Sequence, residues 1–146
     1  MKKIFLTLIA IFSVGIFTAM ADNDKVINRS QLPTPAQEFI NVHFAGIDIT
    51  YAKEEWDFLK HSYEVRLANG TKIEFTSKGD WDEVECRFGE VPAAIIPQAI
   101  KEYIDKNYPG SKVIYIEKDR NDYEVKLSNR LELKFDKDFN IYDIDD

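Results

Sequence analysis

The chain has 146 residues, of which 26 are acidic and 19 are basic, so its formal charge is −7. Hydrophobic residues make up 45% and charged residues 31% of the sequence, which is the balance of an ordinary globular protein. The acidic excess argues against nucleic-acid binding, because contact with phosphates requires a basic surface. The single cysteine, Cys86, excludes an internal disulfide and a cysteine-built zinc site, and we expect it to be a small buried residue on a strand.

The first 21 residues have the pattern of a secretory signal peptide. Two lysines precede an apolar run over residues 4–20, and an Ala-x-Ala cleavage site ends at Ala21. A transmembrane anchor is the alternative, but the run is about as short as a spanning helix can be. We therefore predict export to the periplasm or beyond, cleavage after Ala21 and no stable membrane anchor. Cleavage removes two basic residues and no acidic residue, which leaves a charge of −9.

The remaining sequence divides into a linker and two similar segments. Residues 22–31, which begin with the polar Asp-Asn-Asp-Lys, are predicted to be a linker. Residues 32–90 and 91–146 then resemble each other, because Glu-Phe-Ile at residues 38–40 returns as Glu-Tyr-Ile at residues 102–104. Tyr-Glu-Val-Arg-Leu-Ala-Asn, which starts at Tyr63, likewise returns as Tyr-Glu-Val-Lys-Leu-Ser-Asn, which starts at Tyr123. The sequence therefore predicts two tandem repeats of one unit.

Each repeat is predicted to form one helix followed by about four antiparallel strands. The helices come first, with apolar residues at helical spacing, and Thr34 is a candidate cap of the first helix. Polar and apolar residues alternate in the segments after each helix, which indicates strands. The strands are predicted over residues 63–67, 71–75, 81–86, 113–116, 123–127, 131–135 and 141–144. The expected fold class is α+β, with both helices packed on one face of a combined antiparallel sheet and the opposite face in contact with water.

The order and spacing of these segments resemble the PepSY-like family of secreted bacterial proteins, also described as β-lactamase-inhibitor-like. The resemblance rests on the openings Leu32-Pro33 and Ile96-Pro97, the two helix segments, the Tyr-Glu-Val-x-Leu-x-Asn strands, and Phe75-x-x-x-Gly79-x-Trp81. Residues 139–141 depart from the last motif, which leaves the equivalence of the two turns open. The resemblance implies a non-catalytic protein that holds an enzyme on the open face of its sheet.

No specific catalytic motif is present in the sequence, so we expect neither enzymatic activity nor a cofactor. His43 and His61 lack the spacing of metal ligands. Asp136 and Asp138 imitate the start of a calcium loop, but Ile141 stands at the glycine position and the chain ends before the twelfth position. A polar hairpin turn is the favoured interpretation of this segment. Binding of a small ligand or of calcium through acidic turns is the alternative function.

Two surfaces are candidates for contact with a protein or peptide, such as an envelope hydrolase or protease. Residues 53–61 form a segment four residues longer than its counterpart, and its Trp56 and Phe58 are aromatic residues flanked by charges, as in contact hot spots. A longer hairpin whose aromatic residues fold back onto the sheet is the alternative. Trp81, at the neighbouring turn, completes this candidate edge. The second surface is the open sheet face, with these charged residues: Glu64, Arg66, Glu74, Glu124, Lys126 and Lys134.

Overall fold

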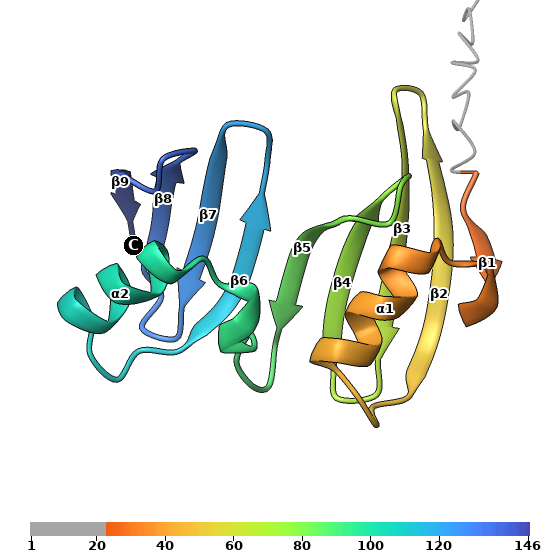
Figure 1. Ribbon diagram of the computed structural model, residues 1–146, viewed down its shortest axis with the longest axis horizontal. Coiled ribbons are helices and arrows are strands. Elements are labelled where there is room, and N and C mark those ends of the chain that lie inside the picture. The colour runs from red at the N-terminus through yellow and green to blue at the C-terminus, as the bar shows by residue number, and fades with distance from the viewer. Residues whose placement is uncertain (1–22) are drawn as a thin grey trace, which may run out of the picture.

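The computed structural model describes residues 23–146, and the predicted signal peptide with its cleavage site lies outside them (Figure 1). The first half contains β1 (Lys25–Ile27), a 3₁₀ helix (Arg29–Gln31), α1 (Thr34–His43), β2 (Ile49–Asp57), β3 (Lys60–Leu67), β4 (Thr71–Thr76) and β5 (Trp81–Cys86). The second half contains a 3₁₀ helix (Ala93–Ile95), α2 (Gln98–Asn107), β6 (Val113–Lys118), β7 (Asp122–Leu127), β8 (Glu132–Asp136) and β9 (Ile141–Asp145). Within residues 23–146, neither helix has the length and hydropathy to cross a membrane.

The nine strands form one antiparallel sheet whose spatial order follows the sequence from β1 to β9. The predicted α+β class, with two helices and an antiparallel sheet, is confirmed. Two local predictions are wrong. Residues 22–31 are not simply a linker, because Lys25–Ile27 pairs with Ala52–Glu54 of β2 as an edge strand too short to show a periodic pattern. Thr34 is the first residue of α1 rather than its cap, since Pro33 occupies the cap position.

A row of apolar side chains crosses the sheet and forms its core. The strand register aligns these six residues, each of which has 0% exposure: Val65, Ile73, Val84, Ile116, Val125 and Leu133. Phe75 contacts Phe39 of α1 edge to face, and Phe135 contacts Tyr103 of α2 in the same way. Because Phe75 and Phe135 point to the same side as this row, both helices cover one face of the sheet (Figure 1). Cys86 is buried on β5, as expected, and burial raises the pKa of its thiol.

Two turns of the second half have the backbone of their first-half counterparts although they lack glycine. Arg130 has φ 75° and donates its N–H to Leu127 at 3.0 Å, as Gly70 with φ 85° donates to Leu67 at 3.0 Å. Phe139 has φ 64° and donates to Asp136 at 2.9 Å, as Gly79 with φ 89° donates to Thr76 at 2.9 Å. Residues 139–141 therefore form the same turn as residues 79–81 despite their different sequence.

Arg130→Gly is expected to stabilise the protein by about 0.5 kcal/mol. A left-handed conformation costs a non-glycine residue about 1–2 kcal/mol, and the greater freedom of glycine in the unfolded chain offsets part of that gain. The measurement is the urea midpoint of wild type and variant. A lower midpoint for Arg130→Gly would show that the side chain makes a stabilising contact that outweighs the strain.

Candidate functional site

The face of the sheet opposite the helices carries a continuous line of glutamates. In register, these five residues lie opposite one another on five successive strands, β3 to β7: Glu64, Glu74, Glu83, Glu117 and Glu124. We call them the glutamate row. Lys53 continues the row at one end and Lys134 at the other. Like charges placed directly opposite each other repel, so the row stores unfavourable electrostatic energy that a cation would relieve.

A second row on the same face contains basic side chains that form ion pairs with some of the glutamates. It contains Tyr51, Arg66, Lys72, Glu85, Tyr115, Lys126, Glu132 and Asp145. Lys72 Nζ lies 2.9 Å from Glu74 Oε1 and 2.6 Å from Glu83 Oε1. Glu117 instead accepts a hydrogen bond of 2.6 Å from the Tyr115 hydroxyl and forms no ion pair with any residue of the described chain. The centre of the row, at the junction of the two halves, is therefore short of positive charge.

The carboxylates of the row differ in pKa according to their surroundings. Burial favours the neutral form of Glu64, but hydrogen bonds from Tyr51 and Arg66 outweigh it and lower the pKa of this carboxyl. Burial raises the pKa of Glu83, and the charges of Glu74 and Glu117 act in the same direction against the hydrogen bond from Lys72. Proton binding is thus favoured near the junction and disfavoured at the β3 end.

The raised pKa of Glu83 predicts a pH dependence of stability. The folded chain holds the Glu83 proton more tightly than the unfolded chain. Protonation of Glu83 therefore contributes to the free energy of unfolding at low pH. It is lost as the pH rises from about 4.5, the ordinary value, through the raised folded pKa. We expect Glu83→Gln to flatten the fall of the urea midpoint over that window. A slope equal to that of wild type would contradict the assignment.

The hairpin of β2 and β3 extends beyond the strands on either side of it. The register of β3 with β4 ends at the pair Ser62 and Thr76, and the register of β1 with β2 ends at Glu54. At the tip, Phe58 is 90% and Leu59 is 91% exposed. Burying such side chains in a partner would remove two large apolar groups from water. The tip is therefore a candidate contact point.

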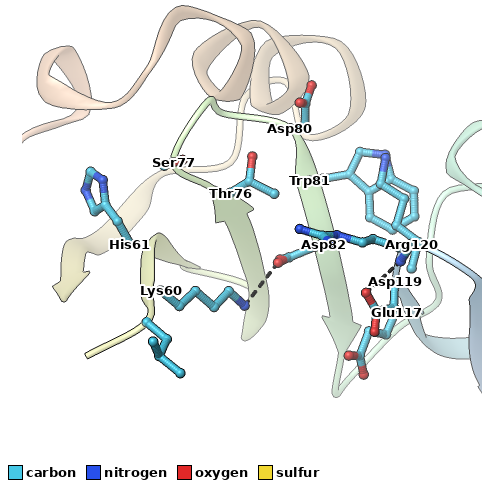
Figure 2. Close-up of a pocket in the computed structure, with 12 residues that line it drawn as sticks. Lys60, His61, Thr76, Ser77, Asp80, Trp81, Asp82, Glu117, Asp119 and Arg120 are labelled. Carbon is cyan, nitrogen blue, oxygen red and sulfur yellow. Dashed lines mark hydrogen bonds and ion pairs between the residues drawn. The ribbon is translucent and has the colours of Figure 1, made fainter. Parts of the chain in front are cut away.

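A pocket of about 700 Å³ lies between this hairpin, the β4–β5 turn and the β6–β7 turn (Figure 2). Its lining consists of Leu59, Lys60, His61, Thr76, Ser77, Asp80, Trp81, Asp82, Glu117, Lys118, Asp119 and Arg120. Figure 2 shows Lys60 reaching towards Asp82, with 3.3 Å between Nζ and Oδ2. Lys118 Nζ lies 4.4 Å from the centre of the Trp81 ring. Glu117 belongs to both the pocket and the glutamate row, so the two features adjoin at this residue.

The structure separates the three aromatic residues of the predicted edge. Trp81 lines the pocket and stacks against Phe39 of α1 with ring centroids 6.1 Å apart. Trp56 is half exposed and stacks on His61 at 3.8 Å, so it folds back onto its own hairpin. Phe58 alone projects freely at the tip. The predicted edge is thus split between a hairpin tip and a pocket wall.

The six charged residues predicted for the open face lie in the two rows, but sequence reasoning missed the residues at their centre. Glu83 and Glu117 are the members that join the two halves. A signal was present, because Glu83 and Glu85 alternate with the apolar Val84 and Cys86. Their position opposite β6 could not be read from the sequence, since α2 separates the two strands.

The Asp136 carboxylate accepts hydrogen bonds from the backbone of its own turn. Asp136 Oδ1 accepts hydrogen bonds of 2.9 Å from the N–H groups of Asp138 and Asn140, and the bonds from Asn140 lower the pKa of this carboxyl.

His43 packs on Phe39 with ring centroids 4.6 Å apart. Among residues 23–146, no three His, Cys, Asp or Glu side chains are grouped so that they could hold a metal ion.

Residues 61–143 match the family described as "Putative beta-lactamase-inhibitor-like, PepSY-like". The chain belongs to this family. No protein with a curated description matches it.

Several solved structures from Bacteroides are similar to the chain over nearly their whole length. A Bacteroides thetaiotaomicron protein, described as a "putative calcium-regulated periplasmic protein", is 55% identical, with a TM-score of 0.83 and coverage of 84% of this chain and 97% of that chain. A Bacteroides vulgatus protein, described as a "putative periplasmic protein", is 51% identical, with a TM-score of 0.84 and coverage of 86% of this chain and 99% of that chain. Another Bacteroides vulgatus protein, described as a "putative periplasmic protein of unknown function", is 41% identical, with a TM-score of 0.81 and coverage of 84% of this chain and 99% of that chain.

Proposed function

We propose that the chain is a periplasmic, non-catalytic binding module that docks a protein or peptide on its open sheet face and on the β2–β3 hairpin. The observation that carries this proposal is the projecting hairpin tip, with Phe58 and Leu59 almost fully exposed beside the pocket that Trp81 lines. Exposed apolar side chains rimmed by charged groups are typical of protein-contact sites. The periplasmic relatives support export, with the signal peptide removed after Ala21.

The two halves, residues 32–90 and 91–146, are proposed to be copies of one unit. α1 with β2–β5 and α2 with β6–β9 have the same order of elements. A register shift at Ile49/Tyr51 has a counterpart at Val113/Tyr115, and another at Glu74/Phe75 has a counterpart at Lys134/Phe135. These matches support duplication, and they make the hairpin tip the main structural difference between the copies.

The proposed docking predicts that truncating the apolar side chains at the hairpin tip weakens binding of the partner protein. Phe58→Ala with Leu59→Ala is expected to reduce the affinity of the mature protein for a captured envelope protein about 10- to 30-fold, because the two truncations together are expected to cost about 1.4–2 kcal/mol of binding free energy. Val42→Ala is the matched control, since Val42 is 73% exposed on α1. Binding is measured by immobilising each variant and titrating the captured protein. Equal affinity of the hairpin variant and wild type would contradict the proposal.

Calcium binding is the second candidate, because one relative is described as calcium-regulated. The acidic groups of this chain favour it less, since Asp136 is engaged by its own turn and the described residues form no three-ligand group. A calcium titration followed by thermal shift separates the two functions. A large, saturable rise in melting temperature would favour calcium binding.

A further inference from the structure

Each half of the chain joins a 3₁₀ helix to the α-helix that follows it, and the two junctions have matching backbones. The 3₁₀ helices Arg29–Gln31 and Ala93–Ile95 stand at the same distance in sequence before α1 and α2. In each, the residue after the 3₁₀ helix donates its N–H to the first carbonyl of that helix, at 3.1 Å and 3.2 Å. Residues 29, 37 and 41 of the first half therefore correspond to residues 93, 101 and 105 of the second.

In the first half, the chain's own polar side chains close this junction. The Arg29 guanidinium crosses from the 3₁₀ helix to α1 and donates a hydrogen bond to Oδ1 of Asn41. The side-chain amide of Gln37 donates to the Leu32 carbonyl at 2.8 Å. A guanidinium and an amide thus supply donors to two acceptors here.

The second half lacks both of these donors. Ala93 takes the place of the arginine, and Lys101 takes the place of the glutamine. Lys101 Nζ pairs with Asp105 Oδ2 at 2.7 Å, and among residues 23–146 no side chain donates to the Ile96 carbonyl. The second junction therefore keeps both acceptor positions, one of them now a carboxylate, but has neither the guanidinium nor the amide.

A pocket of about 290 Å³ lies at this second junction. Ala93, Ile96 and Ile104 belong to its lining, which is mostly apolar, and its charged residues are Glu90, Lys101 and Asp105. Small-molecule sites span about 300–1,000 Å³, so this volume suits a single long side chain. Two carboxylates against one ammonium favour a cationic occupant with an apolar stem.

The ion pair between Lys101 and Asp105 leaves the carboxylate available. The two side chains are 39% and 63% exposed, and an exposed pair four residues apart on a helix contributes little to stability. A guanidinium has five donors in a planar fork and binds a carboxylate through two hydrogen bonds, whereas an ammonium acts as a point charge. A guanidinium bound to Asp105 retains further N–H groups for the Ile96 carbonyl.

We propose that this pocket binds an arginine side chain of a partner peptide, which takes the place that Arg29 occupies in the first half. The aliphatic stem lies against the apolar lining, and the guanidinium contacts Asp105. The site is on the helix side of the sheet and contains no residue of the open-face rows or of the β2–β3 hairpin. It is therefore a binding site in addition to the proposed docking surface, and it does not depend on that surface.

The test is an NMR titration of the mature, ¹⁵N-labelled chain with three capped tripeptides. They are acetyl-Ala-Arg-Ala-amide, its lysine counterpart, and its citrulline counterpart, which has nearly the shape of arginine without the charge. We expect the arginine peptide to shift the amide signals of Ala93, Asp105 and Ser111 saturably, and the other two to bind at least fivefold more weakly. No saturable shift with the arginine peptide, or equal binding of the lysine or citrulline peptide, would overturn the inference.

Matched variants of the protein locate the site. Ala93→Arg is expected to fill the pocket with the chain's own side chain and to weaken binding of the arginine peptide at least tenfold. Asp105→Asn is expected to weaken it about fivefold, because the acceptor remains but its charge is lost. Arg29→Ala, the matched change in the first half, is expected to leave binding at the second junction unchanged. The dispersion of the amide signals verifies that each variant folds, and an unchanged affinity of Ala93→Arg would overturn the assignment of the pocket.

Discussion

Replacing Phe75 or Phe135 by alanine is expected to lower the free energy of unfolding by about 4 kcal/mol in each case. Both side chains have 0% exposure. Phe75 meets Phe39 of α1 with ring centroids 5.7 Å apart, and Phe135 meets Tyr103 of α2 at 5.4 Å. Each substitution therefore removes a large buried ring and an edge-to-face pair, and it leaves a cavity between helix and sheet.

Urea unfolding followed by circular dichroism measures this loss, with Phe88→Ala as the control because Phe88 is 81% exposed. The control is expected to change the free energy of unfolding by less than about 0.5 kcal/mol. Since β5 pairs directly with β6, both halves are expected to unfold in one transition. A loss below about 1.5 kcal/mol, or a separate transition for one half, would contradict the continuous core.

Gly79→Ala is expected to cost about 3 kcal/mol, the second largest effect. Gly79 has φ +89°, and a β-carbon there would lie 2.7 Å from Pro33 Cβ and 3.1 Å from the Ala36 backbone nitrogen. The turn between β4 and β5 thus packs against the start of α1 with no space for a side chain. Strain in the left-handed conformation adds about 1–2 kcal/mol to the cost of that contact.

Gly46→Ala separates the two contributions. Gly46 has φ +79°, but a β-carbon there would meet nothing within 4 Å, so this variant reports the conformational strain alone. We expect it to cost about 1 kcal/mol in the same urea experiment. Equal losses for the two variants would mean that the turn moves away from α1 at little cost.

The periodicity of single segments was enough to predict the class of fold and most of the strands. Alternation placed Val65 and Leu67 in the core and Glu64 and Arg66 on the open face, because side chains point to opposite faces of a strand in turn. The similarity of Tyr63–Asn69 to Tyr123–Asn129 likewise indicated matching strands in the two halves. Such patterns depend only on residues that are close in the sequence, so they can be interpreted without knowing which strands pair.

Features that depend on distant pairing were not predictable from the sequence. The strand Lys25–Ile27 exists because β2 offers it an edge. Glu83 lies opposite Glu117 because the chain returns after α2 in one particular register. Phe139 adopts a left-handed conformation without glycine, and its ring packs on Tyr123 with centroids 5.4 Å apart. The candidate site lies where the halves meet, so its central residues were the ones missed.

Site-specific photo-crosslinking tests most directly whether the open side of the molecule, with its hairpin tip, is the docking surface. A photoreactive phenylalanine analogue placed at Leu59 is compared with the same analogue at Val42 on α1, both strongly exposed positions, in the mature protein mixed with envelope extract. We expect a discrete crosslinked product from position 59 and none from position 42. A product from position 42 alone, or equal products from both positions, would contradict docking on the face opposite the helices.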